Sequence, residues 1–320
     1  MTPISDLERA VAAIVRDCMG VREGEEMLVV CNPATIGIAE RLRAEAGTLG
    51  ADAVTTLMAE RASHAAEPPA AIAAAMAAAD VVLAPTLQSL SHTAARHAAT
   101  EAGVRIATLP GATEEMLGRV MSADMEGLRR KGSAIADLLT AGSEAQITCA
   151  RGSDLRLGLG DRQAIPDAGD LTAPGAFGNL PCGEGFIAPI EGSAEGTLFV
   201  DGTIAAIGRV SEPVELTIEA GHLVAATGPE GDRLMELLTM HGPDGTNVAE
   251  LGVGTNEKAQ LTGNLLEDEK ILGTCHVAFG ASAAIGGTVQ VPVHLDCVVL
   301  EPDLSIDGQP LVRAGRLEVH

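Results

Sequence analysis

His294 and Asp296 lie two residues apart in the apolar stretch VPVHLDCVV, residues 291–299. Residues i and i+2 of a β-strand project from the same face, so these two side chains would stand side by side, while Cys297 would face the opposite, apolar side. Burying an ionised carboxylate without a partner costs several kcal/mol or more. The stretch therefore predicts that His294 and Asp296 share a partner, and we interpret that partner as a metal ion.

Three further segments set an acidic residue or a histidine into a tight, Gly-rich or apolar context. They are GNLPCGEGF with Glu184, NVAELGVGTN with Glu250, and GTCHVAFG with His276. A single histidine in an apolar strand is more often a hydrogen-bonded core residue than a ligand, but five such groups would each need a buried partner. One shared metal site satisfies them all. Together with His294 and Asp296 they form an N/O ligand set that suits Zn, Mn, Co or Fe and can hold one or two divalent ions.

The composition narrows the classes of function. A net charge of −23 argues against nucleic-acid binding, and so does the absence of Trp and Tyr, which leaves no aromatic platform for bases. No apolar run reaches membrane-spanning length, and the N-terminus lacks a signal-peptide pattern. The six scattered cysteines fit free thiols in a reducing compartment. We expect a cytoplasmic protein with a small-molecule or peptide substrate, and no membrane or nucleic-acid partner.

The first part of the chain alternates strand and helix patterns. Continuous apolar strands that alternate with helices are typical of a parallel sheet covered by helices. Residues 1–142 are therefore expected to form an α/β domain with a mainly parallel sheet. The expected strands are 27–33, 53–58, 81–86 and 104–110, and the expected helices are 34–49, 70–79, 91–102 and 112–141.

The second part, residues 143–320, has a different composition and a different pattern of elements. Glycines and turn dipeptides become dense, and hairpin patterns cover 196–208 and 213–228 before a helix at about 229–240. The acidic run LEDEK, 266–270, is interpreted as a solvated loop. We expect this part to be a mixed α+β, metal-binding domain that carries the chemistry.

Over residues 175–300 these segments resemble the thermophilic-metalloprotease type of aminopeptidase, aminopeptidases T and S. The resemblance rests on NLPCGEGF, GTLFVDGTI, AELGVGTN, LLEDEKILGTCHVAFG and HLDCVV, in that order. It implies a homodimer with a two-metal centre in the C-terminal domain. The ligands it implies are Glu184, Glu250, His276, His294 and Asp296, and it makes Glu184 or Glu250 the candidate general base.

The chain departs from these peptidases in two ways. They have a tyrosine shortly after the first histidine that stabilises the tetrahedral intermediate, whereas this chain has ASAAIGGT at 281–288 and no tyrosine anywhere. The span from His276 to His294 is also shorter. Because an oxyanion donor typically contributes ~2.7–4 kcal/mol, a small or cyclic amide becomes an alternative to a peptide substrate.

Two further interpretations stay open. The resemblance extends to the iron-dependent 2,5-dihydroxypyridine ring-cleaving dioxygenases, in which two histidines and one aspartate hold a single Fe(II). His276, His294 and Asp296 would supply that triad. A non-catalytic, metal-stabilised dimer is the third possibility. Because both Glu184 and Glu250 are retained, the sequence favours a metallohydrolase in which a metal-activated water cleaves an amide bond.

Overall fold

The computed structural model describes residues 5–319. The chain forms two compact units: one comprises the residues up to Met125 together with Gly169–Cys182, and the other comprises Glu126–Ala168 together with the residues from Gly183 onward. The predicted division at 142/143 stays a prediction about independently folding domains. Among the described residues, no helix combines the length and the apolar character needed to cross a bilayer.

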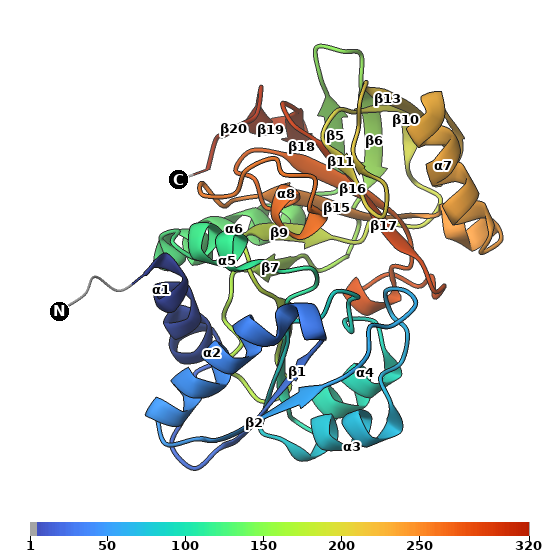
Figure 1. Cartoon of the computed structure of the whole chain (residues 1–320). Coiled ribbons are helices and arrows are strands. Elements are labelled where there is room, and N and C mark those ends of the chain that lie inside the picture. Colours follow the sequence, from blue (N-terminus) through green and yellow to red (C-terminus); the bar gives the residue numbers. More distant parts are fainter. Residues whose placement is uncertain (1–4, 320) are drawn as a thin grey trace. The chain divides into compact units, whose positions relative to one another are not determined.

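The first unit is built on a five-stranded sheet in which every pair of neighbouring strands is parallel (Figure 1). The prediction of a parallel sheet is therefore confirmed. In spatial order the strands are β2 (Asp52–Leu57), β1 (Glu26–Cys31), β3 (Val81–Ala84), β4 (Arg105–Thr108) and β8 (Phe177–Asn179).

Helices pack on both sides of this sheet. They are α1 (Asp6–Ala12), which continues as a π-helix (Ala13–Cys18), α2 (Ile36–Thr48), α3 (Ala70–Ala78), α4 (Ala94–Glu101) and α5 (Glu114–Val120). Ser5, Thr93 and Thr113 begin α1, α4 and α5, and each side chain accepts a backbone N–H of the first turn, as N-capping residues do. Helices α3 and α4 share an apolar cluster with one face of β1 and β3, through residues such as Met76 and Val82.

Two details of this region differ from the prediction. The helix expected over 112–141 is two helices, because the chain turns after Val120 and the Ser122 hydroxyl donates to the Arg119 carbonyl at 2.6 Å. The fifth strand, β8, comes from far along the chain. Its three residues, FGN, carry no apolar run that would have revealed it.

The second unit holds two antiparallel sheets. The strands of the eight-stranded sheet are, in spatial order, β14 (His222–Ala226), β13 (Val214–Glu219), β10 (Glu195–Val200), β6 (Asp154–Gly158), β5 (Glu144–Thr148), β18 (Asp303–Ile306), β19 (Gln309–Arg313) and β20 (Arg316–Leu317). Those of the seven-stranded sheet are β12 (Gly208–Arg209), β11 (Thr203–Ile204), β17 (His294–Val299), β16 (Cys275–Gly280), β15 (Val248–Gly254), β9 (Glu184–Ile187) and β7 (Ile165–Asp167).

One apolar core joins the two sheets of this unit. Leu155 and Leu216 of the eight-stranded sheet belong to the same buried cluster as Leu251, Val277 and Phe279 of the seven-stranded sheet. The helices of the unit are α6 (Met125–Ala141), α7 (Gly228–Thr239) and the short α8 (Leu265–Asp268). Because a strand presents alternate residues to opposite faces, the remaining residues of β15, β16 and β17 point away from this core.

Candidate metal centre

The candidate ligands lie on the seven-stranded sheet, on the face opposite its apolar core. In β17, Cys297 belongs to the core cluster, so His294 and Asp296 project from the other face. The same alternation in β16 puts Cys275 in the core and His276 on the ligand face. The prediction that His294 and Asp296 share a face, with the neighbouring cysteine turned to the core, is confirmed.

The register of the strands brings the ligand residues into one region. Ala278 of β16 pairs with Asp296 on one side and with Glu250 of β15 on the other. Glu184 begins β9 and pairs with Gly254, at the end of β15. Three neighbouring antiparallel pairings therefore gather residues that are up to 112 positions apart in the sequence, from Glu184 to Asp296.

Glu250 lies between the two histidines. Its Oε1 is 3.3 Å from His276 Nε2, and its Oε2 is 3.3 Å from His294 Nε2. His276 Nε2 is also 3.3 Å from Glu184 Oε2, and His294 Nε2 is 3.6 Å from Asp296 Oδ1. Glu184, Glu250 and His276 can approach one ion, and Glu250, His294 and Asp296 can approach another, since the ligand atoms of each group lie within 4.8 Å of one another.

The donor atoms fit a divalent ion. Ligand atoms at about 2.1 Å from a metal, at tetrahedral or octahedral angles, lie roughly 3.0–3.4 Å apart, close to the separations found here. His294 Nδ1 donates to the Ala281 carbonyl at 2.7 Å, which directs Nε2 toward the carboxylates, as is usual for a metal-bound imidazole. Glu184 Oε2 is buried and has no hydrogen-bond partner among the residues described. These buried Glu, His and Asp groups fit a metal site.

The charged side chains of the candidate metal centre shift one another's pKa values. Burial lowers the pKa of His276, but Glu250, Glu184 and Asp296 outweigh it and raise that pKa to about 9. Burial likewise lowers the pKa of His294, and Asp296 with Glu250 raises it well above the usual value. Burial raises the pKa of Glu250, yet the two histidines hold it below the usual range. Without a metal, the histidines therefore carry protons at neutral pH.

Metal affinity is expected to rise with pH. Because a histidine must be neutral to bind a metal, each ion that enters releases protons, and the affinity should increase by up to about tenfold per pH unit for each proton released. For His276 the increase should end near pH 9, where its pKa lies. Titration of metal-free protein with Mn(II) at pH 7 and at pH 8 checks this, with His241→Gln as a control that keeps the wild-type slope. An affinity that does not change with pH would contradict it.

Three buried charged residues of the region, Lys270, Glu269 and Asp167, were not predicted from the sequence. Lys270 Nζ lies 2.5 Å from Glu184 Oε1, 2.6 Å from Glu269 Oε1 and 3.5 Å from Asp167 Oδ2. The interpretation of 266–270 as a solvated loop is wrong, because all five residues are buried. The available signal was the run of three acidic residues followed directly by a lysine in EDEK.

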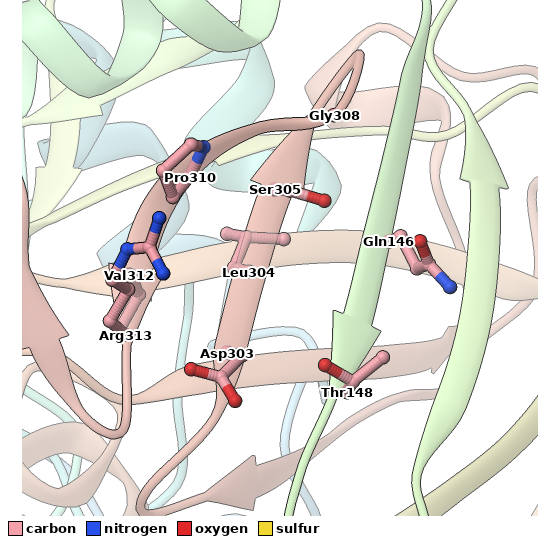
Figure 2. A pocket seen from close by; sticks show the side chains of 9 residues that line it. All are labelled: Gln146, Thr148, Asp303, Leu304, Ser305, Gly308, Pro310, Val312 and Arg313. Carbon is pink, nitrogen blue, oxygen red and sulfur yellow. The ribbon is translucent and has the colours of Figure 1, made fainter.

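A separate hollow of about 290 Å³ lies on the eight-stranded sheet (Figure 2). Gln146 and Thr148 of β5 line it together with Asp303 and Ser305 of β18, and Arg313 of β19 contributes a guanidinium (Figure 2). None of the candidate ligands borders this hollow.

The sequence matches a described protein family and two curated relatives. Residues 11–319 match the family described as NicX, 2,5-dihydroxypyridine 5,6-dioxygenase. The 2,5-dihydroxypyridine 5,6-dioxygenase of Pseudomonas putida KT2440 is 27% identical over 260 residues, which is 75% of this chain and 71% of that protein. Aminopeptidase PepS of Streptococcus thermophilus is 25% identical over 199 residues, 52% of this chain and 46% of that protein.

Two solved structures share the fold. The 2,5-dihydroxypyridine dioxygenase of Pseudomonas putida KT2440 superposes with a TM-score of 0.87 at 22% identity, over 99% of both chains. AmpT of Thermus thermophilus superposes with a TM-score of 0.74 at 20% identity, over 98% of this chain and 99% of that one. The resemblance to the group of proteins that contains both the aminopeptidases and the dioxygenases is thus confirmed.

The interpretation of the chain as an aminopeptidase-like metallohydrolase is wrong. The family match over 11–319 and the relative that covers the larger part of the chain are both dioxygenases, whereas the peptidase matches over 52% of the chain. The retained pair of Glu184 and Glu250 had favoured a two-metal hydrolase. In the structure, however, one oxygen of Glu184 pairs with the Lys270 ammonium, so the presence of this glutamate does not by itself indicate a second ion.

Proposed function

Because the chain belongs to the NicX family of 2,5-dihydroxypyridine 5,6-dioxygenases, we propose that it is an Fe(II)-dependent dioxygenase that opens the ring of 2,5-dihydroxypyridine. The observation that carries this proposal is the family match over residues 11–319. Two buried groups that could hold a metal, Glu184 with Glu250 and His276 and Glu250 with His294 and Asp296, support it. Between them they contain two histidines and an aspartate, the ligand types that non-haem Fe(II) oxygenases use.

We assign the iron ligands to His276, His294 and Asp296. Both histidines direct Nε2 toward carboxylates at 3.3 to 3.6 Å, and the Nδ1 bond of His294 to the Ala281 carbonyl fixes the orientation of one ring. Glu250 lies between the two imidazoles, with one oxygen toward each Nε2.

The proposed reaction needs no co-substrate besides oxygen. Cleavage of the bond between C5 and C6 places one oxygen atom on each carbon, so the hydroxyl-bearing C5 becomes a carboxyl group and C6 becomes a formyl group on the ring nitrogen. Both atoms of O₂ enter the product, and the electrons come from the ring itself. Bound iron supplies the one-electron chemistry that oxygen needs to react with a closed-shell aromatic ring.

The protein's own side chains supply a dry and rigid setting for this chemistry. His276 is 1% exposed, Glu184, Glu250 and Asp296 are 5 to 7% exposed, and the His294 side chain is 15% exposed, so bulk water has little access to most of the ligand atoms. The ligands stand on neighbouring strands of one sheet, and sites on regular strands hold their geometry more precisely than sites on loops. The homodimer implied by the resemblance stays a prediction.

We expect oxygen uptake with 2,5-dihydroxypyridine. Protein stripped of metal and reloaded with Fe(II) under nitrogen should consume one O₂ per substrate after air is admitted, and the ultraviolet absorbance of the aromatic ring should disappear in step. Oxygen-electrode and absorbance traces recorded on the same sample measure both.

The metal and the gas provide the controls. Protein loaded with Zn(II) should leave the ring intact, because Zn(II) has no redox chemistry. Ring opening under nitrogen, or no oxygen uptake by protein that carries a full complement of iron, would reject the proposed function.

A further inference from the structure

Lys270 is an internal cation of the second unit. Its side chain is 0% exposed, and its ammonium contacts three carboxylates that are themselves no more than 10% exposed, those of Glu184, Glu269 and Asp167. Lysine is almost never fully buried unless it is paired. The ammonium is thus a fixed positive charge, and it lies on a carboxylate of the candidate metal centre.

The backbone around Lys270 is fixed by its surroundings. Its carbonyl accepts the N–H of Asn256, and its own N–H donates to the Glu267 carbonyl. Gly254 of β15 allows the segment to pass this closely, because a Cβ at that position would lie 2.0 Å from the Ile271 carbonyl oxygen. Asp268, two residues earlier, accepts two backbone N–H groups of the preceding turn. The backbone that carries the ammonium is therefore held in place on both sides of Lys270.

Glu184 is shared between the ammonium and the histidine side of the centre. Its Oε1 lies 2.5 Å from Lys270 Nζ, while its Oε2 faces His276 Nε2 at 3.3 Å. A divalent ion bound by Glu184, Glu250 and His276 would share the Glu184 carboxylate with a fixed positive charge. Glu250 and Asp296 differ from Glu184 in this respect, since each lies beside the imidazole of His294 instead.

We propose that the Lys270 ammonium takes the place of a second metal ion. It pairs with Glu184 Oε1 as a permanent counter-ion, and its positive charge repels a second cation from Oε2, the oxygen without a hydrogen-bond partner among the described residues. Glu184 is therefore not a metal ligand, and the centre is limited to one divalent ion. The inference rests on the proposed function, which needs a single iron. It explains how the chain keeps every carboxylate of a two-metal set and still holds one ion.

The number of ions bound per chain tests this directly. Metal-free protein is incubated with excess Mn(II), freed of unbound ion by gel filtration and analysed for metal per chain by mass spectrometry. We expect one ion in the wild type and one in Glu184→Gln, which lacks a charge but keeps the lysine. In Lys270→Met, which lacks the ammonium, we expect two ions per chain. Lys258→Met, at an exposed lysine, serves as the matched control and should hold one ion.

Each other outcome overturns the inference. Two ions in the wild type, or loss of the ion in Glu184→Gln, would show that Glu184 is a ligand. One ion in folded Lys270→Met would show that the ammonium does not exclude a second. If Lys270→Met does not fold, the numbers of ions bound by the wild type and by Glu184→Gln still test the inference. Failure of the proposed function is separate: a chain that holds one ion but consumes no oxygen rejects the dioxygenase and leaves this inference standing.

Discussion

Replacing Asp296 or His294 with alanine is expected to abolish iron binding and to lower ring opening by at least about 10³-fold. A metal ion supplies several kcal/mol of stabilisation to a reaction that depends on it, and each 1.36 kcal/mol is about a tenfold change in rate. Both residues lie on the ligand face of β17, with His294 Nε2 3.6 Å from Asp296 Oδ1. Iron content and oxygen uptake measure the two effects on the same preparations.

The fold should survive these substitutions. The apolar core of the second unit lies on the other face of the same strand, through Cys297 and Val299, so circular dichroism should remain that of the wild type. Asp244→Ala, at an exposed aspartate, is the control that should keep both iron and activity. An alanine variant at Asp296 or His294 with full iron content would remove that residue from the ligand set.

The second large effect is expected from the smallest change, Gly252→Ala. Gly252 pairs with His276 across the two strands, and a Cβ at position 252 would lie 2.0 Å from His276 Nε2. The imidazole would have to leave its place, so we expect the Mn(II) affinity to fall by about 10–100-fold or more, as it does when the orientation of a ligand is lost. Overpacking of this kind also costs typically ~1–3 kcal/mol of stability.

A second glycine serves as the control for the effect of a Gly→Ala substitution that causes no steric clash. Gly47 lies within α2, and a Cβ added there would have no atom within 4 Å, so Gly47→Ala should keep the metal affinity and gain roughly 0.5–1 kcal/mol of stability. Calorimetric titration with Mn(II) and thermal unfolding measure both variants. Wild-type affinity in Gly252→Ala would show that His276 does not bind the metal from its present position.

The sequence predicted the parts of the molecule that depend on local periodicity. The mainly apolar segments VVLAPT and VRIATLP indicated the parallel sheet of the first unit, and the alternation in HLDCVV placed Asp296 on one face and Cys297 on the other. The order and context of the five candidate ligands were sufficient to identify a related group of enzymes. Their roles as ligands stay predictions.

What the sequence could not predict depends on contacts between distant segments. Burial of Asp268 requires the N–H groups of Thr262 and Gly263 and the hydroxyl of Thr203, none of which is marked by any local pattern. The ammonium of Lys270 meets Glu184, which is 86 positions away. The choice between hydrolase and dioxygenase was misjudged for the same reason: the presence of Glu184 in the sequence carried no information about its partner.

The position of β8 also bears on how the protein is made. Ser91 and Thr108 of the first unit reach their partner Asn179 only after the ribosome has synthesised α6 and the hairpin of β5 and β6, which belong to the second unit. A nascent chain that folds from its N-terminus would therefore hold a four-stranded sheet without β8 while later segments emerge. Parallel sheets with unpaired edges are prone to aggregate. Slow translation between residues 108 and 177 would prolong that exposure. The rate of synthesis over this segment should therefore affect how much of the chain aggregates before it folds.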